Sequence, residues 1–249
     1  MSQTVVITGG SKGIGWELVQ AFAGAGFNVV SGSRTIRGDV PEKIAKRVRQ
    51  VEVDVKNKKD HYKLVAEANN WSGSLDCYIN NAGYSEWREL KNIDEKFLTN
   101  IFETNLFSYF WGAQAAASSL SKGGSIINIS SLAAKRGTTN NSAYSATKFG
   151  VTALTQSLCK ELGMQGIRVN AVCPVLIDTP GLLTALRNEQ SPSGDDTREF
   201  LENFAASQTA LGRLPTANEV AKLCLFLSSK EASGITGQSI NVDCGVLPN

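Results

Sequence analysis

The sequence predicts a single α/β domain in which helices cover both faces of a parallel sheet. Three observations support this prediction: short apolar runs alternate with helical segments, no repeat or linker divides the chain, and 249 residues suit one large α/β domain. Strands that alternate with helices form parallel sheets, because each helix returns the chain to the edge where the strand began. Hydrophobic residues (42%) and charged residues (19%) occur in the proportions of an ordinary globular protein.

A glycine-rich loop separates the first predicted strand from the first helix. An apolar run at 5–7 precedes the loop, and helical periodicity begins at Ile14. Gly9, Gly13 and Gly15 give the spacing G-x3-G-x-G. In a strand–turn–helix context, glycines let backbone N–H groups approach a pyrophosphate at the helix N-terminus, where the dipole favours anions. We therefore predict a dinucleotide site here, although an isolated glycine motif is often only a turn.

The end of the second predicted strand, 27–31, bears on the choice of dinucleotide. NAD sites hold the ribose 2′-hydroxyl with a carboxylate about 20 residues beyond the glycines. Here Ser33 and Arg34 stand in that region, and Asp39 lies too far along for a tight turn. Arg34, with Lys12 in the glycine loop, suits the 2′-phosphate of NADP, because a guanidinium binds phosphate in a two-pronged manner. The alternative is that both are ordinary surface cations.

The third and fourth predicted strands also end in groups that suit a ligand crevice. The patterns indicate strands at 49–53 and 75–79, with a helix that includes 64–68 between them. The residues that follow the two strands are Asp54 and Val55, and then Asn80, Asn81, Ala82 and Gly83. Side-chain amides at the carboxyl edge of a sheet can fix the loop backbone around a ligand.

A long helix is predicted over 97–120, with Asn105 as a polar residue among apolar ones. A buried asparagine needs hydrogen-bond partners. Asn105 either cross-links the backbone or holds a water molecule in a proton path.

The fifth strand, 124–130, and the helix 144–162 carry the strongest catalytic candidates. Ser131 stands at the end of the strand, where it can hydrogen-bond a substrate oxygen. Tyr144 and Lys148 are four residues apart, so if Tyr144 opens the helix, both lie on one face. A cation near a phenol favours the phenolate, so we expect the pKa of Tyr144 to fall below its usual value of about 10. Such a group can transfer a proton near neutral pH.

This spacing alone is weak evidence. Tyr84 and Arg88 are also four residues apart and have nothing else around them. The Tyr144–Lys148 pair therefore needs support from the rest of the chain.

The remaining elements complete the alternation. A sixth strand is predicted at 167–172, ended by Pro174, and Thr179 and Pro180 have the character of a helix start. The stretch 190–197 has the composition of a loop, either a mobile cover over the strand ends or an inert surface loop. A helix at 218–227 and a short strand at 238–242 follow.

Composition excludes several functions. A net charge of +2 gives no electrostatic reason to expect nucleic acid or anionic membrane, and the basic cluster at 43–49 is predicted to be a solvated face. The single histidine, His61, argues against a Ser-His-Asp triad and a histidine-rich metal site. Five cysteines without a C-x2-C pair indicate reduced thiols. With no targeting signal and no apolar run of about 18 residues, we expect a cytoplasmic protein.

Taken together, these motifs resemble the short-chain dehydrogenase/reductase family along the whole chain. The matching segments are Thr8-Gly9-x3-Gly13-x-Gly15, Asp54-Val55, Asn80-Asn81-Ala82-Gly83, Asn105, Ser131, Tyr144, Lys148, Asn170-Ala-Val-Cys-Pro174, Thr179, Gly212-Arg213 and Thr236-Gly237 with Val242-Asp243. The resemblance implies a Rossmann-type, doubly wound, seven-stranded parallel sheet in one domain, 1–249, usually assembled as a homotetramer or dimer. A substrate-covering segment is expected at about 180–210.

The resemblance also implies the roles of individual residues. Tyr144 would exchange the proton of a carbonyl or alcohol substrate, Ser131 would hydrogen-bond that oxygen, Lys148 would lower the pKa of Tyr144 and bind the nicotinamide ribose, and Asn105 would hold a water. NADP(H), preferred over NAD(H), would contact Gly9, Ser11, Lys12, Gly13, Ile14, Gly15, Ser33, Arg34, Asp54, Val55, Asn81, Ala82, Gly83, Tyr144, Lys148, Pro174, Ile177 and Thr179. No metal is expected.

The chain departs from the family pattern at two positions. Val175 and Cys244 stand where glycine is common, and Val175 would narrow the substrate side of the pocket. Gln165 occupies a turn where acyl-carrier-protein reductases often have arginine, which lowers the expectation of a 3-oxoacyl-thioester substrate. The other alternative is a non-catalytic NADP-binding sensor or interaction protein. The residues expected to face the substrate, including Lys135 and Arg136, do not select a chemical class.

Overall fold

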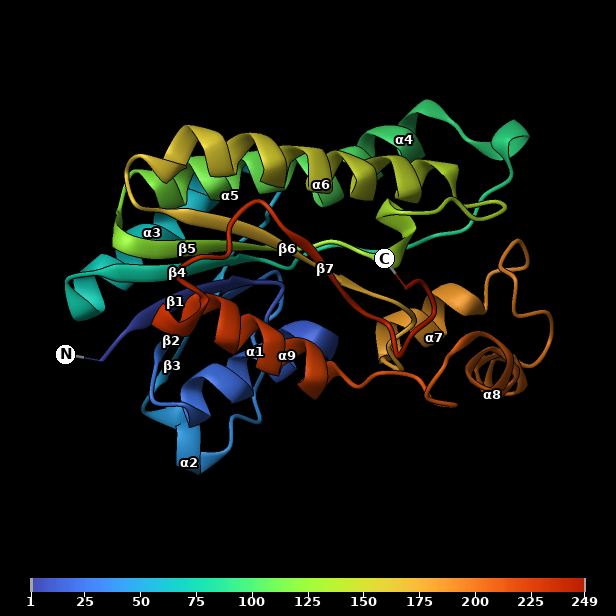
Figure 1. Cartoon of the computed structure of the whole chain (residues 1–249), viewed down its shortest axis with the longest axis horizontal. Coiled ribbons are helices and arrows are strands. Elements are labelled where there is room, and N and C mark those ends of the chain that lie inside the picture. Colours follow the sequence, from blue (N-terminus) through green and yellow to red (C-terminus); the bar gives the residue numbers. More distant parts are fainter. Residues whose placement is uncertain (1, 249) are drawn as a thin grey trace.

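The computed structural model describes residues 2–248, which form one seven-stranded sheet with helices on both faces (Figure 1). The strands are β1 (Thr4–Thr8), β2 (Asn28–Ser33), β3 (Val48–Glu52), β4 (Leu75–Asn80), β5 (Leu120–Ile129), β6 (Arg168–Pro174) and β7 (Ser239–Val242). They are parallel and lie in the order β3-β2-β1-β4-β5-β6-β7. The predicted doubly wound α/β fold is therefore confirmed.

Helices pack on the two faces of the sheet as separate layers. Figure 1 shows α1 (Gly13–Gly24), α2 (Glu42–Ala45) and α9 (Ala217–Ser228) on one side, and α3 (Lys58–Ser72), α5 (Ser108–Ala117) and α6 (Ser142–Gly163) on the other. Successive residues of β1 divide between two cores: Val5 and Ile7 pack with α1 and α9, whereas Val6 packs with α3. This follows from the two-residue period of a strand, and it explains why strands covered on both faces are apolar throughout.

The order of the strands reverses at β1, which has β2 on one side and β4 on the other. In open α/β sheets, ligands bind outside the carboxyl ends of the strands at such a point. Beyond the strand ends lie α7 (Pro180–Leu186) and α8 (Thr197–Gln208), joined by turns (Figure 1).

The prediction of one long helix over 97–120 is wrong in two respects. It consists of α4 (Glu95–Phe102) and α5, separated by a π-helical turn at Glu103–Phe107, and β5 already begins at Leu120. A π-turn adds a residue to one turn and leaves the flanking apolar pattern helical, so periodicity does not reveal it. The apolar Leu120 fits either a helix or a strand, and only its pairing with Leu75 of β4 decides.

Two buried polar groups tie elements of the fold together. The Arg168 guanidinium on β6 donates to the carbonyls of Leu227 (2.7 Å) and Ser229 (3.1 Å) at the C-terminal end of α9. His61 on α3 lies 1% exposed, although its sequence neighbours are polar. Its Nε2 is 2.8 Å from the Val55 carbonyl, and its Nδ1 is 2.8 Å from the Tyr78 hydroxyl. A carbonyl only accepts, so Nε2 carries the hydrogen and Nδ1 accepts from Tyr78.

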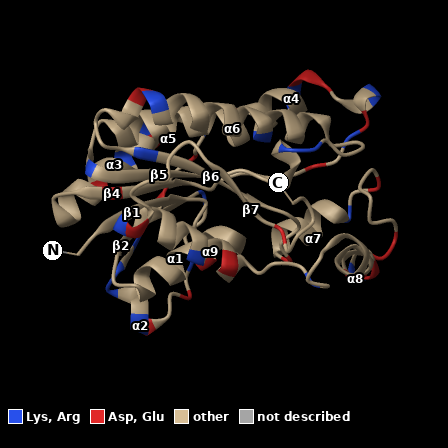
Figure 2. Ribbon diagram, in the orientation of Figure 1, with Lys and Arg blue, Asp and Glu red and all other residues tan. Residues whose placement is uncertain are grey.

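The charged residues of both signs are distributed over the surface (Figure 2). In the basic cluster at 43–49, Lys43, Lys46 and Arg49 are exposed, as predicted for a solvated face. Arg47 is half-buried and donates to the carbonyl of Gly26 (2.7 Å).

Candidate active site

The glycine loop between β1 and α1 forms a cradle with no room for side chains. A Cβ on Gly15 would lie 2.0 Å from the carbonyl oxygen of Gly9, and a Cβ on Gly9 would lie 2.9 Å from the Cα of Ala82. Gly13 has a φ of +55°, which favours glycine. The first turn of α1 has no side-chain cap at Lys12, so its N–H groups are free for an anion. These features fit the pyrophosphate of a dinucleotide.

The segment after β4 fastens this cradle. Asn81 donates from its Nδ2 to the carbonyl of Thr8 (2.9 Å), and its backbone N–H donates to the Thr8 hydroxyl (3.0 Å). The backbone N–H of Ala82 also donates to that hydroxyl (3.2 Å). The amide of the sequence motif therefore holds the loops after β1 and β4 against each other.

The segment after β6 forms the opposite wall. A Cβ on Gly13 would lie 3.6 Å from Thr179, whose hydroxyl accepts from the N–H of Leu182 (3.2 Å) and caps α7 as predicted. Pro174 still belongs to β6 and pairs with Val242 of β7. Ile177 is 4% exposed and packs in the core, so its side chain is largely shielded from a ligand.

Basic residues gather at the end of β2. Ser33 is buried and donates to the carbonyl of Thr35 (2.8 Å), and Arg34 is exposed. The sequence reasoning missed Arg37. Its guanidinium donates to the carbonyl of Ser11 in the glycine loop (3.2 Å) and to Asp39 (2.6 Å), and it lies 4.4 Å from the ring of Trp16. No spacing rule points to it, because an irregular segment brings it back to the loop.

The loop after β3, where Asp54 and Val55 are expected to contact the cofactor, is fixed by the first turn of α3. The backbone N–H of Asp54 donates to the Asp60 carboxylate (2.8 Å), and the carbonyl of Val55 accepts from His61 (2.8 Å). The side chain of Val55 is 9% exposed. Among residues 2–248, the Asp54 carboxylate accepts a hydrogen bond only locally, from the N–H of Lys56 (3.0 Å).

Ser131 and Tyr144 meet beyond the end of β5. Ser131 follows β5, and its hydroxyl accepts from the N–H of Ala133 (3.1 Å). Tyr144 is the third residue of α6, which begins at Ser142 and not at Tyr144. Burial raises the pKa of Tyr144, and a hydrogen bond with Ser131 acts in the opposite direction. The expected fall of this pKa is therefore wrong, because the effect of burial outweighs the hydrogen bond with Ser131.

Lys148 lies one helical turn further along α6 and is 3% exposed. Its Nζ donates to the carbonyl of Ile129 (2.9 Å) and to the hydroxyl of Tyr109 (3.3 Å), and it lies 5.8 Å from the ring centroid of Tyr144. Burial lowers the pKa of Lys148 to about 8. The Lys148 ammonium therefore lies near the ring of Tyr144, within the distance of a cation–π contact.

Asn105 uses its amide to hold the backbone of Tyr84. Its Oδ1 accepts from the N–H of Tyr84 (3.0 Å), and its Nδ2 donates to the carbonyl of the same residue (2.8 Å). A Cβ on the preceding Gly83 would lie 3.1 Å from Asn105 Oδ1 and 3.6 Å from Lys148 Nζ. Of the two roles considered for Asn105, the structure has the backbone cross-link, and the π-turn aims the amide at this segment.

Three segments are joined by hydrogen bonds next to α7 and α8. Gln190 accepts at Oε1 from the N–H of Glu89 (2.7 Å) and at its carbonyl from Asn140 (3.1 Å), and Arg88 donates its N–H to the Asn140 carbonyl (2.6 Å). Beneath these bonds, Trp87 packs with residues of α7 and α8. The stretch 190–197 is therefore tied to its neighbours.

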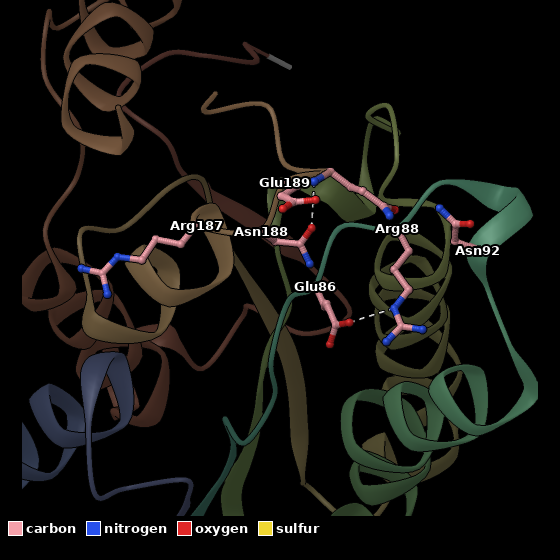
Figure 3. Close-up of a pocket in the computed structure, with 7 residues that line it drawn as sticks. Glu86, Arg88, Asn92, Arg187, Asn188 and Glu189 are labelled. Atoms are coloured by element: carbon pink, nitrogen blue, oxygen red, sulfur yellow. Dashed lines mark hydrogen bonds and ion pairs between the residues drawn. The ribbon is translucent and has the colours of Figure 1, made fainter. Parts of the chain in front are cut away.

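A pocket of about 450 Å³ lies along this junction (Figure 3). Glu86 and Arg88 point toward each other in it and form an ion pair (2.8 Å), whereas Arg187 points away from them. The other lining residues are Asn92, Asn188, Glu189 and Gln190.

Lys135, one of the residues expected to face the substrate, is bonded to the backbone of β7. Its Nζ donates to the carbonyl of Ser239 on β7 (2.8 Å). Within residues 2–248, no group of three or more His, Cys, Asp or Glu side chains could hold a metal ion. In the same part of the chain, every helix is too short or too polar to traverse a bilayer.

Known proteins resemble this chain over its full length. Residues 9–247 match the family model described as Enoyl-(Acyl carrier protein) reductase. L-2,3-butanediol dehydrogenase of Corynebacterium glutamicum is 34% identical over 270 residues, which cover 100% of both chains. Diacetyl reductase ((S)-acetoin forming) of Staphylococcus epidermidis is 35% identical over 257 residues, with 99% of both chains covered.

A solved structure agrees with these relatives. The ligand-free aldohexose dehydrogenase of Thermoplasma acidophilum superposes with a TM-score of 0.89 at 30% identity, covering 98% of this chain and 94% of that one. Fold, motifs and relatives lead to one conclusion: the chain belongs to the short-chain dehydrogenase/reductase family.

Proposed function

We propose that this chain is an NADP(H)-dependent oxidoreductase that interconverts a small carbonyl compound and the corresponding secondary alcohol. Membership of the family makes it an oxidoreductase of the dehydrogenase/reductase type. One observation carries the proposal: Ser131, Tyr144 and Lys148 converge at the carboxyl end of β5, on the sheet edge where the glycine cradle opens. A hydroxyl, a phenol and a buried ammonium in this arrangement suit proton transfer to an oxygen.

In the proposed reduction, Tyr144 donates a proton to the substrate oxygen and Ser131 donates a hydrogen bond to the same oxygen. Lys148 stabilises the phenolate that remains on Tyr144, because an ammonium near a phenolate lowers its energy. A bound nicotinamide would supply the hydride to the carbonyl carbon in this direction and would accept it in the reverse reaction. The residues that would hold it are those of the cradle, the Asn81–Gly83 segment and the wall at Pro174, Ile177 and Thr179.

We assign the preference for NADP(H) to the cations at the end of β2. Ser33 carries no charge to repel a 2′-phosphate, and Arg34 is exposed and close in sequence to Ser33. Lys12 stands at the start of α1, and Arg37 bonds to the loop at Ser11. These three cations favour a doubly charged phosphate over a ribose hydroxyl.

The segment of about 180–210 is proposed as the cover of the substrate site. The bonds of Gln190 and the packing of Trp87 hold it against the segment that follows Gly83. The cover favours a small substrate, in keeping with the butanediol and diacetyl of the relatives' names. A 3-oxoacyl thioester remains the second candidate, because a 3-oxoacyl-(acyl-carrier-protein) reductase of Chlamydia muridarum is 32% identical over 99% of this chain.

We further propose that the protein is a homo-oligomer that assembles through α5 and α6. Phe110 on α5 and Phe149 on α6 are 47% and 46% exposed, and Phe107, in the π-turn just before α5, is 43% exposed, which is unusual for aromatic side chains. Replacing Phe110 and Phe149 by Glu should shift the mass measured by light scattering toward that of a monomer. A wild-type protein that is already monomeric would refute this assembly. The five unpaired cysteines are in keeping with a cytoplasmic location.

The test of the proposed function is turnover by purified wild-type protein and by Tyr144→Phe. We expect wild type to oxidise NADPH with diacetyl, acetoin or another small ketone. Tyr144→Phe should lose at least about a hundredfold in kcat, the range of general acid catalysis, and keep its affinity for NADPH. Undiminished turnover by the variant would refute the role of Tyr144. NADPH binding without turnover on ketones, keto-sugars and 3-oxoacyl thioesters would favour the sensor alternative.

A further inference from the structure

The ammonium of Lys148 is held by a second tyrosine, Tyr109 of α5. Lys148 Nζ donates to the Tyr109 hydroxyl (3.3 Å) and to the Ile129 carbonyl (2.9 Å). The Tyr109 hydroxyl donates its own hydrogen to the same carbonyl (2.8 Å). Because that hydrogen is engaged, the phenol oxygen presents only its lone pairs to Lys148. The Tyr109 ring centroid also lies 5.1 Å from Nζ.

These contacts matter because Lys148 carries a positive charge in a buried position. Lys148 is 3% exposed and Tyr109 is 1% exposed, and no carboxylate within residues 2–248 pairs with Lys148. The titratable groups that face it are Tyr109 from α5, Tyr144 from its own helix and Cys173 from β6. A buried ammonium is therefore stabilised by one carbonyl, one phenol and two aromatic faces.

Counting hydrogens shows why the charged form is needed. An ammonium has three hydrogens, and Ile129 and Tyr109 use two, which leaves one for a ligand hydroxyl or for the Tyr144 side. A neutral amine has only two hydrogens, and both would be engaged by Ile129 and Tyr109. Loss of the proton would thus remove the positive charge and the free N–H together.

We propose that Tyr109 is a positioning residue that keeps Lys148 charged and oriented for its work on Tyr144. The inference rests on the proposed function for its catalytic meaning, and on the geometry alone for the effect on Lys148. Burial lowers the pKa of Lys148 to about 8, so at pH 7 the charged form exceeds the neutral form by only about tenfold. The Tyr109 oxygen is the acceptor whose removal would disturb it most, since the Ile129 carbonyl belongs to the backbone of β5.

The first experiment titrates Lys148 directly in ligand-free protein by NMR, with 13C label at lysine Cε. For wild type, we expect a midpoint near pH 8. In Tyr109→Phe, which keeps the ring and loses the oxygen, the midpoint should fall by about one pH unit, as expected for loss of a hydrogen bond to a charged group. An unchanged midpoint in a folded variant would overturn the inference. If Tyr109→Phe does not fold, Tyr109→Met, which also lacks the oxygen, is titrated in its place.

The second experiment follows the ratio of wild-type to Tyr109→Phe kcat as a function of pH. If the midpoint moves from about 8 to about 7, the charged fraction falls roughly twofold at pH 7 and roughly eightfold at pH 8.5. A ratio that grows with pH is therefore the signature of positioning through Lys148. A ratio that is constant with pH would indicate only a structural defect and would contradict the proposal.

Thr155→Val is the matched control. Thr155 is a fully buried residue of the same helix, and its hydroxyl accepts from Asn128 (2.9 Å) and donates to the carbonyl of Val151 (2.9 Å). Its loss should reduce stability and leave the Lys148 midpoint and the pH dependence of kcat unchanged. The two proposals can fail separately. If wild type shows no turnover but Tyr109→Phe still shifts the Lys148 midpoint, the oxidoreductase function is refuted. If wild type turns over normally but Tyr109→Phe does not shift the midpoint, the role of Tyr109 is refuted.

Discussion

Arg34 and Arg37 should affect the preference for NADPH over NADH in different ways. Arg34 is exposed and engages no acceptor within residues 2–248, so its guanidinium is available to a phosphate. Arg37 already bonds to the Ser11 carbonyl and to Asp39, and its side chain is 29% exposed. Arg34 should therefore act on the phosphate alone, and Arg37 on both the phosphate and the shape of the loop.

The magnitude follows from the exposure of each group. A hydrogen bond to a charged group contributes about 1.5–3 kcal/mol when shielded, and solvent around Arg34 reduces this to about 1 kcal/mol. Arg34→Ala should then raise the KM for NADPH roughly fivefold and leave the KM for NADH unchanged. Arg37→Ala removes the bond to Ser11 as well as a charge, so both KM values should rise, with that for NADPH rising more.

The assay is steady-state kinetics with each cofactor at two salt concentrations. The Arg34→Ala effect should shrink at high salt, because exposed charges are screened. Lys46→Ala, which removes an exposed cation at the end of α2, is the control and should leave both KM values unchanged. Equal effects of Arg34→Ala on the two cofactors would refute the assignment of Arg34 to the 2′-phosphate.

Two predictions concern stability. Arg168→Met leaves the carbonyls of Leu227 and Ser229 without their donor and should lower the free energy of unfolding by about 3 kcal/mol in urea titration. The control Arg49→Met removes an exposed ion pair with Glu67 and should lower it by less than about 1 kcal/mol. Equal losses in the two variants would contradict the role of Arg168 at the end of α9. Burial lowers the pKa of His61 in the folded protein, so below pH 6.5 the unfolded chain binds a proton that the folded chain does not. Wild type should therefore lose about 1 kcal/mol of unfolding free energy between pH 7.5 and pH 5.5 that His61→Gln does not lose, and identical pH dependence of the two proteins would show that His61 takes up its proton in the folded state.

Much of the fold could be predicted because its signals are local. The strands of the sheet, the glycine turn and the start of α7 at Thr179 all follow from apolar runs, glycine spacing and capping chemistry. The π-turn around Asn105 could not be predicted, since the insertion of one residue preserves the apolar face on either side. The sequence likewise predicted that Asn105 needs partners, and the structure adds that both partners belong to Tyr84.

The candidate site was predictable where a motif names the residue and not where tertiary packing supplies it. Gly9, Ser131, Tyr144 and Lys148 are readable from spacing, and the structure brings the last three together. Arg37 and Tyr109 carry no motif, because their contacts join elements far apart in the chain. The pKa of Tyr144 shows the same limit: spacing reveals the neighbouring cation, but burial depends on every element packed around the phenol.

The bonds from Asn81 and Ala82 to Thr8 have a consequence for the kinetics of cofactor capture. Since the protein's own hydrogen bonds fasten the two loops to each other, a dinucleotide meets a surface whose shape needs no assembly. Binding then causes little loss of loop entropy, and the association rate of the dinucleotide should be limited by diffusional encounter and not by a loop rearrangement. With a substitution such as Asn81→Ala, the two loops would have to become ordered each time a dinucleotide binds.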